Sequence, residues 1–202
     1  MPTVLTHAVV PLAIAVGLGR KRIPPRLMIA GIVAAMLPDL DVVGLRFGVA
    51  YAHAFGHRGA THSVLAALCL GLIAALAAPW FRASRRCAAL FLFAATLSHP
   101  LLDMLTNGGL GIALGWPFSS TRYFFQTRPI IVSPLGLHRL LSQAGWHVAS
   151  SEWRCVWLPA IAVAALCRTA LALTAKLTMI PSAAPTSSST TTYHEKPHGF
   201  RP

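Results

Sequence analysis

The chain has 202 residues, of which 55% are hydrophobic and only 11% are charged, and its mean hydropathy is +0.61. A soluble domain normally carries about 25% charged residues, so this chain has too few charges to cover a surface that faces water. The composition therefore argues against a soluble enzyme and predicts an all-α integral membrane protein.

Two short apolar segments open the chain. Residues 7–19 form an apolar run that Pro11 interrupts, and as a helix it would be about 20 Å long, which is short for a full span. A basic turn at 20–26 leads to a second apolar helix over 27–37. These two helices either form a hairpin that crosses half of the membrane, or the second continues beyond Asp41 and spans it. The sequence leaves both alternatives open.

The middle of the chain predicts two spanning helices. The first runs over 62–81, with Thr61 or Ser63 available as its N-cap, and the second runs over 87–105. The basic turn at 82–86 joins them, and Asn107-Gly108-Gly109 ends the second helix.

Residues 110–152 predict an interfacial loop region, with one short helix at 134–145, because its Trp and Tyr side chains suit the headgroup zone. A last spanning helix is expected from Cys155 to about Leu177. We thus expect a bundle of four to five helices in a membrane-embedded domain over 1–180, followed by a disordered tail over 181–202.

The net charge of +12 is concentrated in the connectors. The turns at 20–26 and 82–86 hold seven of the 17 Lys and Arg residues. The positive-inside rule explains such clusters more simply than nucleic-acid binding does, so no nucleic-acid partner is expected. Short basic loops stay cytoplasmic, which would place the opposite ends of the helices at the external face.

Nearly all the histidine and carboxylate side chains within the apolar part of the chain fall at that opposite end. If successive helices cross the membrane in alternate directions, these residues all lie at helix ends on one side of the membrane. Both basic turns then lie on the other side. Ionisable groups at membrane depth cost about 2.5–3.5 kcal/mol each, so they tend to be paired, metal-bound or functional. The predicted metal ligands are His7, Asp39, Asp41, His57, His62, His99 and Asp103.

The residue types indicate a divalent-metal site. His99 and Asp103 are spaced i, i+4 and share one helix face, although Pro100 between them is expected to disrupt the helix locally. Mixed imidazole and carboxylate ligands suit Zn, Mn or Fe better than Ca or Mg, and we expect one or two ions, with Zn favoured. Asp39 or Asp41 is the candidate general base.

An anionic substrate is expected beside the metal ligands. Arg58 lies between two candidate ligand histidines and can hold an anion by bidentate contacts. Thr61 and Ser63 complete the predicted substrate-binding set. A metal centre with these neighbours is typical of enzymes that hydrolyse phosphoesters, including those in lipids.

These residues also resemble a known family. His7, Pro38-Asp39-Leu40-Asp41, His57-Arg58-Gly59-Ala60-Thr61-His62-Ser63 and Ser98-His99-Pro100-Leu101-Leu102-Asp103 look like the YdjM-type, LexA-regulated family of membrane-bound metal-dependent hydrolases. The resemblance covers about residues 1–175 and includes Thr106-Asn107-Gly108-Gly109 and Trp116-Pro117-Phe118-Ser119. It implies a multi-pass protein of the inner membrane of a bacterium or archaeon.

The family is in turn distantly similar to zinc-dependent phospholipases C and single-strand-specific nucleases, which are all-helical zinc enzymes. This chain lacks their second His-x-x-x-Glu/Asp pair, which puts a third metal in doubt. Two classes of function remain: a metal-dependent hydrolase, or a non-enzymatic protein that is either a metal or ion permease or carries a structural metal site. A permease needs polar residues in both halves of the bundle, whereas here they lie at one end.

Overall fold

A computed structural model describes residues 1–133 and 141–178. These residues form an all-helical bundle, and no strand occurs in the part of the chain that is described. The helices are α1 (Val4–Leu18), α2 (Pro25–Met36), the 3₁₀ turn η1 (Leu37–Asp41), α3 (Val42–Arg46), the 3₁₀ turn η2 (Ala60–His62), α4 (Val64–Leu76), α5 (Ala78–Phe81), α6 (Arg85–Met104), α8 (Gln143–Glu152), the π-helical turn η3 (Trp153–Trp157) and α9 (Leu158–Thr178).

Within the described residues, three helical segments are long and apolar enough to cross a membrane: Pro25–Arg46, Arg85–Met104 and Gln143–Ala175. The first of these favours the alternative in which the second helix continues beyond Asp41, because α2, η1 and α3 follow one another without a break. Helices α1 and α4 are apolar but shorter, with 15 and 13 residues. The expected bundle of four to five membrane helices is therefore confirmed as three long helices and two shorter ones.

The helix expected over 62–81 is shorter than predicted. It begins at Val64, where the Ser63 hydroxyl accepts a hydrogen bond from the Ala66 N–H at 3.1 Å, so Ser63 is the N-cap. It ends at Leu76, and a separate turn, α5, follows. Pro79 explains the break, because proline lacks an N–H and restricts the residue before it.

The C-terminal helix is longer than predicted. It begins at Gln143 rather than Cys155 and continues through η3 into α9, so the end of the expected 110–152 loop is helical. The predicted helix at 134–145 lies largely outside the described residues, as does the predicted tail.

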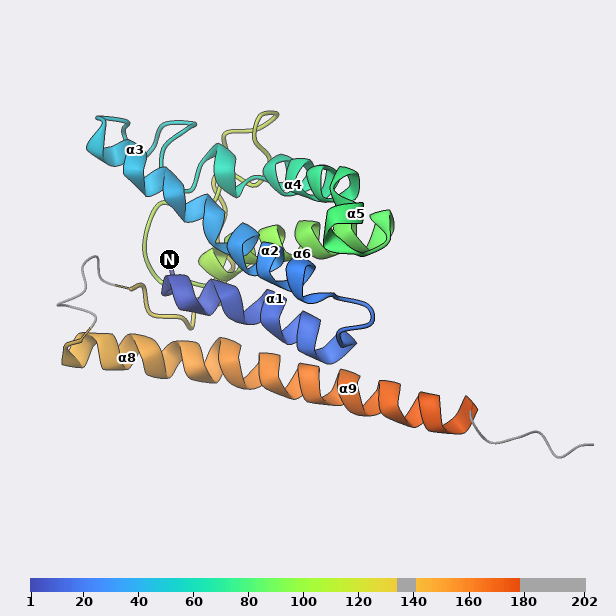
Figure 1. The fold of residues 1–202 in the computed structure, drawn as a ribbon. Coiled ribbons are helices and arrows are strands. Elements are labelled where there is room, and N and C mark those ends of the chain that lie inside the picture. The colour runs from blue at the N-terminus through green and yellow to red at the C-terminus, as the bar shows by residue number, and fades with distance from the viewer. Residues whose placement is uncertain (134–140, 179–202) are drawn as a thin grey trace, which may run out of the picture.

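Two prolines, contrary to expectation, do not interrupt the helices in which they lie. Pro11 lies inside α1 and Pro100 inside α6, and both helices are continuous through them. Helix α6 packs between α2 and α4 (Figure 1), and these neighbours stabilise it where the proline removes one hydrogen bond. His99 and Asp103 therefore keep helical spacing.

The bundle is held together by close approach of small residues. Helices α2, α4 and α6 share an apolar core that includes Leu27, Ala74 and Phe91. A Cβ at Gly31 of α2 would lie 2.3 Å from the Phe91 ring, so glycine is needed for the ring to lie against that helix. Helix α9 runs along the outer side of α1 (Figure 1), where Gly17 lies against Ala164 and Cys167 and lets the two backbones approach.

Candidate metal centre

Four segments bring the predicted ligands to one end of the bundle. Helix α1 supplies His7, η1 supplies the aspartates at 39 and 41, the loop ending in η2 supplies the histidines at 57 and 62, and α6 supplies His99 and Asp103. The basic turns lie at the opposite end of the α1–α2 and α4–α6 hairpins (Figure 1). The expectation that these residues converge is confirmed by their contacts.

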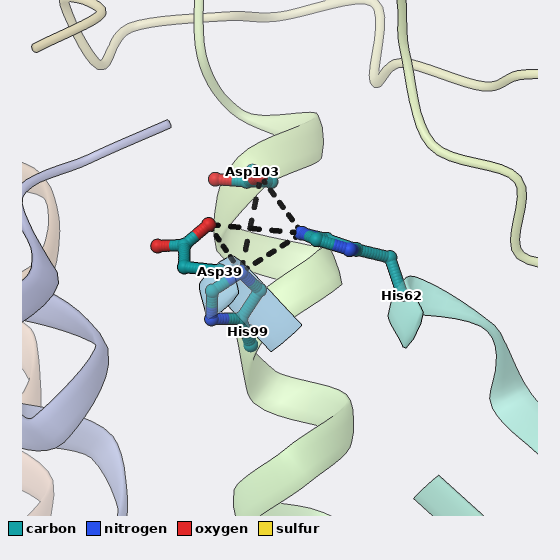
Figure 2. Close-up of side chains that lie close together, drawn as sticks. All are labelled: Asp39, His62, His99 and Asp103. Atoms are coloured by element: carbon teal, nitrogen blue, oxygen red, sulfur yellow. Dashed lines mark hydrogen bonds and ion pairs between the residues drawn. The ribbon is translucent and has the colours of Figure 1, made fainter. Parts of the chain in front are cut away.

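Four side chains point at one another in the centre of this cluster: Asp39, His62, His99 and Asp103 (Figure 2). We call them the four-donor set. One ligand atom from each lies within 4.8 Å of the other three. His99 Nε2 lies 3.3 Å from Asp39 Oδ1 and 4.0 Å from Asp103 Oδ2. His62 Nε2 lies 3.9 Å from Asp39 Oδ1 and 3.6 Å from Asp103 Oδ2.

These separations fit a tetrahedral ion. Zinc binds nitrogen and oxygen at about 2.0–2.2 Å, so the edges of an ideal tetrahedron around it measure roughly 3.3–3.6 Å. The interatomic distances within the four-donor set fall around that range, and all four residues are buried.

The two histidines present lone pairs to the same point. His99 Nδ1 lies 2.7 Å from the Ala35 carbonyl, and His62 Nδ1 lies 3.2 Å from Asp41 Oδ2, so both Nδ1 atoms are placed to carry the hydrogen. Burial lowers the pKa of His62, which favours its neutral form. With the hydrogens on the two Nδ1 atoms, the two Nε2 atoms, 3.1 Å apart, would be free to bind one cation between them.

The carboxylates of the four-donor set form no hydrogen bonds, although Arg58 Nε lies 3.2 Å from Asp103 Oδ2 as an ion pair. All four oxygens of Asp39 and Asp103 are buried without a hydrogen-bond partner. Buried polar groups are normally satisfied, and each exception needs an explanation. With neutral histidines, the three carboxylates of Asp39, Asp41 and Asp103 against the Arg58 guanidinium leave two negative charges. One divalent cation would balance that charge, so the residues present fit a metal ion.

His7 borders the four-donor set. Its ring stacks on His99 with a centroid distance of 3.7 Å, and its Nε2 lies 3.7 Å from Asp103 Oδ1 and 4.0 Å from Asp39 Oδ2. The ring is completely buried, and neither nitrogen has a hydrogen-bond partner. His7 thus faces the two carboxylate oxygens that point away from the other histidines.

Asp41 and His57 lie on the other side of His62. Asp41 is well supplied with donors: it accepts hydrogen bonds from the Thr61 hydroxyl at 2.7 Å and the Arg58 backbone N–H at 3.2 Å. His57 Nδ1 lies 2.7 Å from Asp41 Oδ1. These residues can form a second metal group with His62, but the geometry also suits an Asp41 that orients His62 through its Nδ1. Both roles stay predictions.

The predicted substrate-binding residues already have partners within the chain. Arg58 is 1% exposed, and its guanidinium lies 3.2 Å from Asp103 Oδ2 and donates to the Gly108 carbonyl and the Thr106 hydroxyl. Its backbone is left-handed, with φ of 66°, a conformation that is strained for arginine. Ser63 caps α4 and donates to the Ala60 carbonyl. A substrate role for these residues stays a prediction.

Some residues around the cluster could not be found from the sequence. Arg122 donates to the carbonyls of His57, Arg58 and Gly111 at 3.2–3.4 Å, so it holds together loops that are distant along the chain. Ala35 orients His99 through its backbone. Neither residue could be identified from the sequence, because every residue has a backbone carbonyl and Arg122 belongs to no recognisable motif.

Comparison with known proteins identifies the family of this chain. The model of the YdjM inner membrane protein family matches residues 1–177. The chain belongs to the YdjM family. It is 50% identical to the inner membrane protein YbcI of Escherichia coli K12 over 160 residues, which cover 79% of this chain and 92% of that protein.

A second YdjM-family relative is the Escherichia coli inner membrane protein YdjM itself. The identity is 36% over 141 residues, which cover 64% of this chain and 65% of the relative. No solved structure matches the chain significantly. The predicted family and the inner-membrane location of its members are therefore confirmed, and all seven predicted ligands lie in the matched region.

Proposed function

We propose that this YdjM-family protein is a membrane-bound hydrolase that uses one divalent ion, held by the four-donor set, to cleave a phosphoester. The observation that carries the proposal is the meeting of two histidine Nε2 atoms with two buried carboxylates that form no hydrogen bond. Zinc is the ion that best suits these ligands and distances. LexA regulation stays a prediction from the family resemblance.

The chain supplies two further groups for hydrolysis. A bound divalent ion polarises a phosphoryl oxygen and increases the acidity of water. Asp39 Oδ2 faces His7 rather than the histidines of the four-donor set, so Asp39 can accept a proton from an attacking water. His7 can in turn stabilise the protonated carboxyl, because a neutral imidazole offers both a donor and an acceptor.

A lipid-like substrate is supported by the surroundings of the cluster. Phe47 at the end of α3 is 82% exposed, Phe55 in the loop before His57 is 61% exposed, and Phe118 is 93% exposed. Exposed apolar rings at the end of a membrane bundle can insert at the boundary between headgroups and acyl chains. A substrate held in that zone would have its phosphoester near the depth of the metal centre.

One observation favours the second candidate, a structural metal site. His62, His99 and Asp103 are completely buried and Asp39 is only 8% exposed, and structural zinc sites are typically closed. The two functions differ in what the ion does after the protein has folded. A structural site would bind metal and stabilise the fold without turnover.

The test combines metal analysis with an activity assay. The protein is purified in detergent without chelator, its metal is measured by mass spectrometry, and phosphodiester and phospholipid cleavage are assayed before and after metal removal. His99→Ala should lose metal and activity, whereas His147→Ala, at an exposed position in α8, should keep both. Metal binding without cleavage of either substrate class would favour the structural site, and a protein that binds no metal would contradict both candidates.

A further inference from the structure

A second polar feature lies at the opposite end of α1, about 18 Å from His7 at a helical rise of 1.5 Å per residue. Arg20, Lys21 and Arg22 follow the C-terminal end of α1 and are all exposed. Arg168 of α9 lies beside them, because a Cβ on Gly19 would be only 2.3 Å from its Nη1. None of these four cations forms an ion pair with another described residue.

Arg168 needs a partner more than the other three do. It belongs to the apolar segment Gln143–Ala175, which is long enough to cross a membrane. A charge in such a helix is costly unless it pairs or reaches the headgroup zone. The four described carboxylates are engaged at other sites, three in the metal cluster and Glu152 at the start of α1.

Three cavities meet at Arg168. A cavity of about 520 Å³ is lined by the basic turn and the end of α9. A second, of about 370 Å³, shares Gly19, Arg20 and Arg168 with the first. A third, of about 400 Å³, is an apolar groove between α1 and α9 that shares Leu12, Val16 and Arg168 with the second and continues to Trp157. The cations therefore lie at one end of a continuous apolar groove.

The length of the groove suits one acyl chain. From Arg168 to Trp157 the helix rises about 16 Å. One leaflet of the hydrocarbon core is about 15 Å deep, so a chain that starts at the cations would reach about the membrane midplane. A free anion would use only the basic end, and a partner helix would not need four cations beside an apolar groove.

We propose that this groove binds one anionic glycerophospholipid. Its phosphate is held by Arg168 together with the basic turn Arg20–Lys21–Arg22, and one acyl chain lies between α1 and α9. Basic pockets between membrane helices are known to suit anionic headgroups. This site is separate from the metal centre, so the lipid is a structural ligand and not the substrate of the proposed hydrolase.

Native mass spectrometry of delipidated protein in mild detergent tests the proposal. The protein is titrated with phosphatidylglycerol and with phosphatidylcholine of the same acyl chains. The wild type should bind one phosphatidylglycerol about tenfold more tightly. Arg168→Gln should weaken that binding about fivefold, as expected for the loss of one cation near a membrane surface, and Arg168→Lys, which keeps the charge and serves as a check on folding, should retain most of it.

Matched charge variants separate a site from a general surface effect. The triple change Arg20→Gln, Lys21→Gln and Arg22→Gln should weaken phosphatidylglycerol binding at least tenfold. The triple change Arg82→Gln, Arg85→Gln and Arg86→Gln removes the same charge from a turn that lines none of the three cavities, and it should leave the binding within about twofold.

The acyl chain has its own test. Ala165→Phe places a bulky ring in the groove and should weaken binding without a change in charge. Equal binding of the two lipids, an equal loss in both triple variants, or displacement of the lipid by millimolar glycerol phosphate would each overturn the proposal. The last result would show that the cations bind a free anion rather than a lipid.

Discussion

The guanidinium Nε of Arg58 lies 3.2 Å from Oδ2 of Asp103, and both side chains are at most 1% exposed. Arg58 also donates to the Gly108 carbonyl at 2.8 Å and to the Thr106 hydroxyl at 3.1 Å, so three contacts fix the orientation of its fork. Arg58 thus orients the carboxylate of a candidate metal ligand without itself offering an atom to the metal. This relationship leads to the first prediction.

Arg58→Lys should weaken metal binding about 10- to 100-fold, which is the usual effect of losing a group that orients a ligand. A lysine keeps the charge but cannot make the three contacts of the planar fork. Metal affinity is measured by competition with a chelator of known affinity. Arg128→Lys is the control, because Arg128 contacts Phe124 and not the metal cluster. Unchanged affinity with loss of activity would instead support Arg58 as the anchor of an anionic substrate.

Asp41→Asn distinguishes one ion from two. If Asp41 orients His62, the variant should still bind one ion per chain when metal is in excess, at about 10- to 100-fold lower affinity. If Asp41 and His57 hold an ion of their own, a wild type with two ions should retain only one after the change. The measurement is the metal content per chain at several free-metal concentrations, with Asp103→Asn as the variant that should lose the central ion.

Glu152 of α8 links the start of α1 to the C-terminal helical segment through hydrogen bonds. Its carboxylate accepts hydrogen bonds from the Thr3 backbone N–H and from the Thr3 and Thr6 hydroxyls, each hydroxyl at 2.7 Å. Thr6 also accepts a hydrogen bond from Trp157 Nε1 at 2.9 Å. This group lies at the N-terminus of α1, where a negative charge is favourable, and it keeps His7, one residue after Thr6, in place.

Glu152→Ala should therefore lower the free energy of unfolding by about 3 kcal/mol, because hydrogen bonds to a charged group contribute roughly 1.5–3 kcal/mol and buried donors are left unpaired. Thermal unfolding in detergent measures the effect. Glu152→Gln should cost less, since an amide still accepts hydrogen bonds, and Gln143→Ala, at an exposed position at the start of α8, should change little. Equal stability of all three variants would show that the contacts of Glu152 are not important.

The metal centre should face away from the cytoplasm. The two basic turns hold seven of the 17 Lys and Arg residues, and short basic loops resist translocation. In a chain whose four native cysteines have been replaced, a single cysteine at Ser120 should react with a membrane-impermeant maleimide in cells with a permeable outer membrane. A single cysteine at Arg86 should not react until the inner membrane is broken. Both positions are exposed, and the reverse pattern would place the metal centre at the cytoplasmic face.

The sequence by itself determined the membrane character of the chain and the list of candidate metal ligands. Long apolar stretches can be recognised in the sequence without knowledge of tertiary contacts, because each helix must suit the bilayer by its own length and composition. The i, i+4 spacing of His99 and Asp103 is equally local, since helical geometry alone puts both residues on one face. Because successive helices run in alternate directions, the positions of the candidate ligands along the chain already placed them at one end of the bundle. No information about packing was needed for this prediction.

The tertiary structure decided which of those residues lie together and what each one contacts. Four of them meet around one point, while Asp41 is surrounded by donors and Arg58 is buried against Asp103. The early start of the last helix, at Gln143, was likewise visible only in the structure. Hydrogen-bond partners such as the Ala35 carbonyl, 64 residues from His99, are set by how the helices pack, and no local pattern along the chain encodes such a contact.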